Sequence, residues 1–345
     1  MIEISLSDEI IRRHKDFIFG ENKSKENRLY QKLLFKYENE DSKYEKALYK
    51  FILRNLEDII IGNIKTLFEI KEEFSKRLNR LSKEKQIVFV KELDIFHEEY
   101  LKFYVDKVFN AYEFQKLLQI NICPYCATQY IFLYESSDGK TRGTLDHFID
   151  KARYPIFSVS IYNLVPCCKV CNSDFKGRKE MDVINFYSPY EKGIIENISF
   201  SKELVENKEE IIVPKVVREL NLNDESTEID YVNMFLGIGD DFNIQLDYSN
   251  VPSDIARKIK GNIELFKVLY IYNIYHKTTV QDAIKKAYLY NYIYRKQLYD
   301  AFGGFFSSEE ELKQILMPNK KWDDKLILNK LLRDILLQET KNFMY

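Results

Sequence analysis

All five cysteines of this 345-residue chain lie between positions 123 and 171, and four of them form two Cys-x-x-Cys pairs. The pairs are Cys123-Pro-Tyr-Cys126 and Cys168-Lys-Val-Cys171. Two residues between ligands let both sulfurs of one turn face a single tetrahedral ion, and two such pairs make a closed four-thiolate zinc site. A disulfide framework would spread its cysteines along the chain. The clustering predicts structural zinc and leaves Cys167 as a small buried residue.

Side chains of a different chemistry lie between the two cysteine pairs. Asp146 and His147 stand together in an apolar, β-prone run, and two asparagines follow at Asn163 and Asn172. A single Asp-His dipeptide or a single asparagine carries little information. An acid, an imidazole and two amides in one short segment are a stronger signal, because the chain has only four histidines.

The order of these blocks resembles the HNH endonucleases, whose ββα-metal motif runs Asp-His, then Asn-Leu-x-Pro, then Cys-x-x-Cys-Asn followed by lysine and glycine. The matching blocks here are Asp146-His147, Asn163-Leu164-Val165-Pro166, and Cys168-Lys-Val-Cys171-Asn172 with Lys176-Gly177. The Arg153-Tyr154-Pro155 stretch is similar to the loop between the two strands. The resemblance covers about residues 121–179. One departure is that Lys176 follows Asn172 by four residues, where three is common.

The resemblance implies a metal-dependent endonuclease that hydrolyses DNA and leaves 5′-phosphate and 3′-hydroxyl ends. It implies that His147 is the general base, since a neutral imidazole accepts a proton near neutral pH. It implies that Asp146 and the Asn172 amide oxygen bind a catalytic Mg²⁺ or Mn²⁺, and that Asn163 holds the loop and orients His147. The side chains expected to contact substrate are Lys176, Arg153, Lys151 and Arg178. Zinc on Cys123, Cys126, Cys168 and Cys171 is then structural, and the second metal does the chemistry.

One question stays open at this level. Neighbouring residues of a strand point to opposite faces, so Asp146 and His147 need a distorted strand, or a ligand that reaches round its edge, to serve one site.

The elements that must position these residues are expected to be mainly helical. Before residue 119, apolar residues recur at helical spacing, as in Leu101, Tyr104, Val105, Val108 and Tyr112, and a break is expected near Gly62. An Asp138-Gly139 turn separates two β-prone runs, further strand-like runs are ISFSK, EEIIVPK and FNIQLDY, and helices return from about residue 252. These patterns therefore predict a mainly α fold class with a small α+β insert, and the resemblance implies that this insert is a ββα-metal core embedded between helical regions. The expected domains are a helical 1–118, a nuclease domain with its zinc site at 119–190, and a mixed, then helical 191–345.

Charge and hydropathy limit the class of protein. The net charge is −2, but residues 139–180 carry eight basic and four acidic side chains, a local excess that suits phosphate. No run approaches the 18 apolar residues of a membrane span, and the first residues lack the pattern of a signal peptide. We expect a cytoplasmic protein without membrane contact.

The partners follow from the same comparison. The helical flanks exceed what catalysis needs, and the architecture resembles nuclease subunits of bacterial anti-phage systems such as Septu and some retrons, in which an ATPase holds the nuclease. DNA, an ATPase partner and an identical chain are the expected partners. Two alternatives remain: a zinc-containing nucleic-acid-binding module without catalysis, and an RNA-cleaving nuclease. His14, His97 and His276 are expected to have ordinary surface, capping or core roles.

Overall fold

The structure is a computed structural model that describes residues 2–20, 29–204, 242–248, 251–308, 311–312 and 326–342. The chain divides into two compact units. The first unit comprises residues 1–125, 129–192 and 257–262, and the second comprises residues 126–128, 193–256 and 263–345. The expected strand EEIIVPK (209–215) lies outside the described residues. The described part is mainly helical with small antiparallel sheets, as the sequence predicts.

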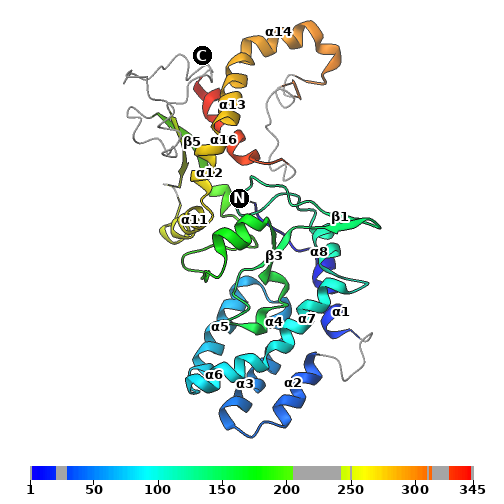
Figure 1. Cartoon of the computed structure of the whole chain (residues 1–345). Coiled ribbons are helices and arrows are strands. Elements are labelled where there is room, and N and C mark those ends of the chain that lie inside the picture. The colour runs from blue at the N-terminus through cyan, green and yellow to red at the C-terminus, as the bar shows by residue number, and fades with distance from the viewer. Residues whose placement is uncertain are drawn as a thin grey trace. The chain divides into compact units, whose positions relative to one another are not determined.

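Eight helices make up the N-terminal part of the first unit (Figure 1). They are α1 (Asp8–Phe19), α2 (Leu29–Glu38), α3 (Lys43–Arg54), α4 (Leu56–Ile61), α5 (Ile64–Leu78), α6 (Lys83–Glu92), α7 (Asp94–Val105) and α8 (Ala111–Leu118). The break expected near Gly62 is confirmed, because Gly62 caps α4 and the Asn63 side chain accepts a hydrogen bond from Thr66 N–H at the start of α5. Buried aromatic rings, including Phe17, Phe103 and Phe109, fill the space between α1, α7 and α8.

The prediction of one apolar helical face over residues 101–112 is wrong. Helix α7 ends at Val105, and the Asp106 carboxylate accepts hydrogen bonds from the backbone of Val108 and Phe109, which turns the chain out of the helix. Val105 is 78% exposed and Val108 is 70% exposed, so neither belongs to the core. The apolar residues keep their helical spacing across the turn at Asp106, so this spacing did not show where the helix ends.

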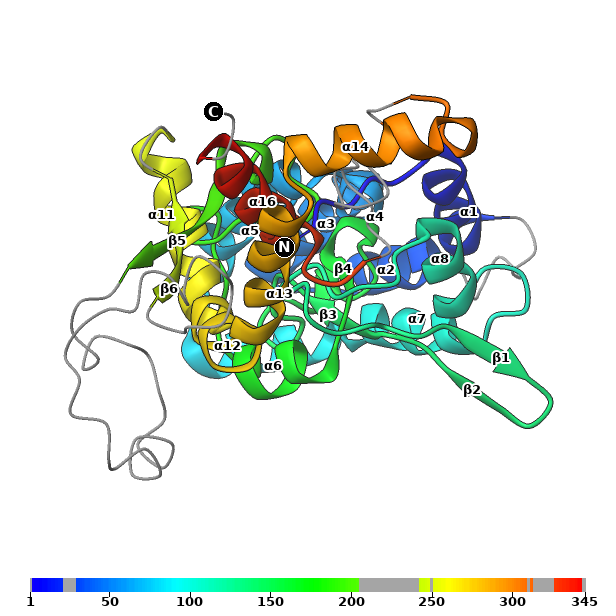
Figure 2. The ribbon, with the colours of Figure 1, turned by 90° about the horizontal axis from the view of Figure 1, so that it is seen from above.

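Two hairpins follow the helices. Strands β1 (Tyr134–Ser136) and β2 (Gly139–Thr141) meet at the expected Asp138-Gly139 turn and extend away from α8 in both views (Figures 1 and 2). Strands β3 (Thr144–His147) and β4 (Leu164–Cys167) pair antiparallel, with Asp146 opposite Val165. A π-helix, η4 (Val170–Lys176), follows β4 and packs against β3. The order strand, strand, helix is the one that the sequence motif predicts for this segment.

The connection between β3 and β4 is held by the helices around it. It contains two 3-10 turns, η2 (Pro155–Phe157) and η3 (Ile161–Asn163), and these pack against α4 and α7. His14 Nε2–H of α1 donates a hydrogen bond to the Val159 carbonyl at 2.7 Å, and the Ser160 hydroxyl donates to the Ile59 carbonyl of α4. His14 is fully buried, so it has a core role and not a surface one.

The second unit contains a hairpin and helices. Strands β5 (Ser199–Leu204) and β6 (Phe242–Asp247) pair antiparallel, which confirms the expected strands ISFSK and FNIQLDY. The helices are α12 (Val268–Tyr275), α13 (Lys277–Leu289), α14 (Tyr292–Phe302) and α16 (Asn329–Asn342), with a 3-10 turn, η7 (Gly303–Phe305), after α14. Helix α11 (Ser253–Leu265) precedes them, and its residues 257–262 belong to the first unit. Helix α16 packs on α13 through Ala283, Ala287 and Leu336. Within the described residues, no helix combines the length and hydropathy of a bilayer span.

The buried imidazole of α1 gives a test of how the helices hold the connection. Replacing His14 by alanine removes a buried hydrogen bond and leaves a cavity among Phe17, Phe103 and Phe109. We expect a loss of about 3 kcal/mol in the free energy of unfolding, measured by urea denaturation. The control is Arg12→Ala on the same helix, whose side chain is 67% exposed, with an expected loss below about 0.5 kcal/mol. Equal losses for both variants would contradict this account.

Candidate active site and metal centre

His147 ends β3, and its ring is buried and held on two sides. Its Nε2–H donates a hydrogen bond to the Ser158 carbonyl at 2.9 Å. The Tyr100 ring of α7 packs edge-on against it, with centroids 4.6 Å apart. Since a carbonyl can only accept, Nε2 carries the proton in the neutral ring and Nδ1 keeps its lone pair. Burial, and then the charge of Lys151, lower the pKa of His147 well below the usual 6.5, so the ring is neutral near pH 7.

Asp146 is buried beside it and has two donors of its own. The Tyr125 hydroxyl donates to Oδ2 at 2.7 Å, and the Lys176 ammonium donates to Oδ1 at 2.6 Å. Lys176 Nζ also donates to the His147 carbonyl. Burial, and then the nearby Asp146 charge, raise the pKa of Tyr125 well above 10, so this phenol stays a donor. Lys176 therefore joins the two neighbouring residues of β3 to helix η4.

Asn163 holds the connection between the strands closed. Its Oδ1 accepts a hydrogen bond from the Ile149 backbone N–H at 2.6 Å. Its Nδ2 donates to the carbonyls of Ile149 and Phe157, at 3.1 and 2.9 Å. The side chain is fully buried, and all its contacts are to backbone. It fixes the segment that ends at Ser158, the residue that accepts the hydrogen bond from His147.

The other predicted site residues differ in how exposed their side chains are and in whether they form ion pairs. Asn172 is half-buried on η4, one turn before Lys176. Lys151 is half-buried, with its ammonium 4.6 Å from the centre of the Tyr100 ring. Arg153 is 61% exposed and pairs with Glu180, and Arg178 is exposed. Lys176 is buried in its ion pair, so the predicted phosphate contact of Lys176 requires that ion pair to open.

The sequence did not predict three of the residues that shape the site. They are Tyr100, which contacts the His147 ring, Tyr125, which donates to Asp146, and Ser158, whose carbonyl fixes the ring. Tyr125 could have been noticed as the residue before Cys126 in the first cysteine pair. Tyr100 lies on a helix distant in sequence, and Ser158 acts through its backbone, so neither leaves a local signal.

The four paired cysteines meet in one buried cluster. The sulfurs of Cys123, Cys126, Cys168 and Cys171 all lie within 4.8 Å of one another. Four thiolates around zinc, with Zn–S bonds of about 2.3 Å, stand about 3.8 Å apart, so the cluster fits this ion. The Cys171 backbone N–H points at the Cys168 sulfur at 3.4 Å, and the Thr128 hydroxyl donates to the Cys126 sulfur at 3.1 Å. Such donors stabilise thiolate charge around a metal.

The fifth cysteine does not belong to the cluster. Cys167 ends β4, is fully buried, and its sulfur lies 3.7 Å from the Thr144 hydroxyl. Burial, and then the charge of Asp146, raise the pKa of its thiol well above 9. Cys167 is thus a packed thiol, as the sequence predicts.

Asp146 and Asn172 each carry oxygen atoms of the kind that a magnesium ion binds. A carboxylate and a carboxamide oxygen are the hard ligands this ion prefers, with waters and phosphate completing its shell. The Asp146 carboxylate already accepts two hydrogen bonds. An ion at Asp146 must therefore compete with the ammonium of Lys176 for the same charge.

No protein-family model, curated protein or solved structure matches this chain. The interpretation of the site thus depends on its residues and their geometry.

The cysteine cluster is tested by matched serine variants. Cys126→Ser and Cys171→Ser each remove a thiolate from the cluster, and a closed zinc site contributes on the order of ~10 kcal/mol to folding. We expect both variants to lose bound zinc and to unfold at lower temperature. Cys167→Ser should keep zinc and melt close to wild type, since Thr144 can bond the new hydroxyl. Elemental analysis should find about one zinc per wild-type chain, and a zinc-free wild type would contradict the assignment.

Proposed function

We propose that this protein is an HNH-type endonuclease that hydrolyses phosphodiester bonds in DNA. The observation that carries the proposal is the orientation of His147, whose Nε2–H is fixed on the Ser158 carbonyl while Nδ1 keeps its lone pair. Support comes from its neighbours, since a carboxylate precedes it and a strand-strand-helix segment with a four-cysteine cluster surrounds it. A module that only bound nucleic acid would not require a buried, neutral and oriented imidazole.

In the proposed reaction, His147 Nδ1 takes a proton from water as the oxygen attacks the phosphorus. The P–O bond to the 3′ oxygen breaks, and that oxygen leaves with a proton from solvent, which gives 5′-phosphate and 3′-hydroxyl ends. Burial keeps the imidazole neutral and ready to accept, and the Ser158 carbonyl keeps Nδ1 aimed in one direction. After proton uptake, Lys151 and the buried surroundings disfavour the imidazolium, so the ring returns its proton.

Asp146 and Asn172 would hold the catalytic Mg²⁺ or Mn²⁺. When bound, the ion would supply a Lewis acid that stabilises negative charge on the phosphate and the leaving oxygen. Tyr125 holds one carboxylate oxygen of Asp146, which fixes the orientation of the ligand. Lys176 neutralises Asp146 when the ion is absent. The competition between Lys176 and the ion predicts weak metal binding, strengthened by the charge of the substrate.

The substrate and partners belong to the same proposal. The excess of basic side chains in residues 139–180 favours phosphate, whereas the chain as a whole has a net charge of −2. We infer weak, salt-dependent affinity for DNA by the isolated chain, and a partner, an ATPase in an anti-phage system, that supplies further grip. RNA is the alternative substrate, because the residues around His147 act on phosphate and do not read the sugar.

Replacing His147 by alanine should abolish cleavage. Loss of the general base costs about 10²–10⁴ in rate. The measurement is plasmid cleavage by purified protein with Mg²⁺ or Mn²⁺ and without either ion, where only wild type with metal should cut. His147→Asn is the conservative variant, because its amide can still donate to Ser158 but cannot act as the base.

The outcomes of this experiment separate the alternatives. Near-wild-type turnover in both His147 variants would remove this residue from the mechanism. A wild type that binds plasmid but never cuts it would favour the binding module or a missing partner, and co-purification from the native host distinguishes these two. Cleavage of RNA with plasmid left intact would favour the ribonuclease.

The pH dependence of cleavage follows from the lowered pKa of His147. The base acts in its neutral form, so activity is present above the folded-state pKa and is lost as pH falls through it. We expect the acid limb of kcat/KM to lie below the ordinary imidazole value of 6.5. Lys151→Ala removes a repulsive charge and should move that limb to higher pH. An acid limb above 6.5 in wild type would contradict the role of His147 as a buried neutral base.

A further inference from the structure

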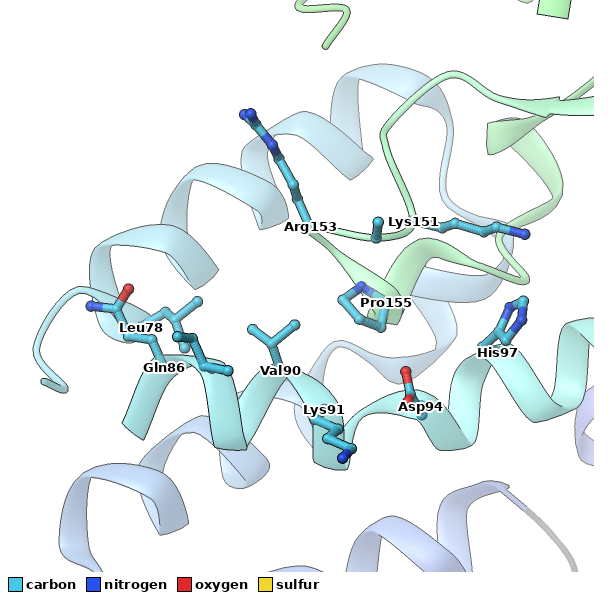
Figure 3. A pocket seen from close by; sticks show the side chains of 11 residues that line it. Leu78, Gln86, Val90, Lys91, Asp94, His97, Lys151, Arg153 and Pro155 are labelled. Atoms are coloured by element: carbon cyan, nitrogen blue, oxygen red, sulfur yellow. The ribbon is translucent and has the colours of Figure 1, made fainter. Parts of the chain in front are cut away.

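A cavity of about 650 Å³ lies in the first unit, between helix α6, the start of α7 and the connection that follows β3 (Figure 3). Ile87 and Val90 of α6 and Pro155 of η2 form its apolar surface. Figure 3 shows Val90 pointing toward Pro155. A cavity of this size accommodates a ligand as large as a nucleotide.

The charged side chains around the cavity define the chemistry of its ligand. Lys91 and Lys151 line it, and within the described part of the chain neither forms an ion pair. Because no carboxylate among the described residues neutralises them in an ion pair, these two charges favour an anion such as phosphate, and Lys151 also lies over the Tyr100 ring. Asp94 and His97 line the same cavity, and Figure 3 shows them next to each other on α7. Because a carboxylate repels a bare anion and accepts hydrogen bonds, the ligand must also present N–H or O–H donors.

The cavity is connected to the candidate active site through side-chain contacts. The Lys151 ammonium lies 4.6 Å from the centre of the Tyr100 ring, and the His97 ring stacks on Tyr100 at 5.9 Å. Tyr100 also contacts the His147 ring, with centroids 4.6 Å apart. Only one aromatic side chain thus separates the residues of the cavity from the proposed general base. A ligand held by Lys151 and His97 would therefore be separated from His147 by the Tyr100 ring alone.

We propose that the cavity binds the nucleotide of the substrate strand that flanks the scissile phosphate. This inference rests on the proposed nuclease function and names a subsite for it. The face of the base lies on Ile87, Val90 and Pro155, and Lys151 contacts the phosphate on the side nearest His147. Asp94 accepts hydrogen bonds from donors on the base edge, as carboxylates do with exocyclic amines. The subsite requires a nucleotide that is unstacked from its neighbours, so single-stranded or frayed DNA is the preferred form.

Helix α6 offers a matched pair of variants for the test. Ile87 lines the cavity and is 71% exposed, whereas its neighbour Val88 is 56% exposed and does not line it. An aspartate at either position faces solvent, so both variants should fold. In Ile87→Asp, the new carboxylate removes apolar contact with the base and repels phosphate.

The measurement is the fluorescence anisotropy of a labelled short single-stranded DNA oligonucleotide, with full-length protein carrying His147→Ala to prevent cleavage. We expect Ile87→Asp to weaken binding about tenfold, in the range of one lost base contact, and Val88→Asp to change it less than about twofold. Lys151→Ala should also weaken binding and reduce its dependence on salt. Equal affinities for the Ile87→Asp and Val88→Asp proteins would overturn the proposal.

A second arm distinguishes a strand from a free nucleotide. Suppose that wild type binds dAMP and that Ile87→Asp does not, while both proteins bind the oligonucleotide with equal affinity. The cavity then takes a free nucleotide, and the proposal fails. Cleavage assays separate this failure from that of the nuclease itself. A wild type that cuts DNA, with Ile87→Asp cutting equally well at low substrate concentration, would refute only the subsite. A wild type that cuts neither alone nor together with the protein that co-purifies from its native host would refute the proposed function.

Discussion

Three consecutive residues, Ser158 to Ser160, connect the candidate base to the helices of the first unit. The Ser158 carbonyl holds His147, the Val159 carbonyl accepts from His14, and the Ser160 hydroxyl donates to α4. A connection between two short strands has many conformations available, and fixing each residue costs about 1–2 kcal/mol of entropy. The buried contacts on both sides offset this cost. The position of the imidazole therefore depends on helices that are distant from it in sequence, and this explains why so large a helical region surrounds so small a motif.

The buried pair of Lys176 and Asp146 is the second constraint on the site. Removing two charges from water is costly, and their mutual attraction offsets it only when further hydrogen bonds satisfy both groups. Here the Tyr125 hydroxyl donates a second hydrogen bond to the Asp146 carboxylate, and the His147 carbonyl accepts a second hydrogen bond from the Lys176 ammonium. The pair ties η4 to β3, since Lys176 belongs to the helix and Asp146 to the strand.

Asp146 and His147 are neighbours on β3, and their side chains have separate partners. Asp146 and His147 point to different sides of β3, toward Tyr125 and toward Ser158 respectively. The strand ends at His147, and Lys176 contacts both the Asp146 side chain and the His147 backbone. Lys176 therefore ties the Asp146 carboxylate to the end of the strand, whereas the His147 ring is held by the Ser158 carbonyl.

The sequence by itself determined the features that depend on neighbours along the chain. Paired cysteines predicted the cluster, Asp138-Gly139 predicted a hairpin, and Gly62 predicted a helix break, because each depends on the geometry of a few consecutive residues. The order Asp146, His147, Asn163 and Asn172 indicated a candidate site.

The tertiary structure alone decided which residues meet across long separations. His14 reaches Val159 over 145 residues, and Tyr100 contacts His147 from a helix whose pattern suggested only core packing. Periodicity records which side of an element is apolar, and it does not record what lies against that side. For that reason, the periodicity predicted a helical face that extended past Val105 into exposed residues. It also gave no sign that the Lys176 ammonium bonds to Asp146. Those contacts form only when distant segments pack together, because their partners are set by the fold as a whole.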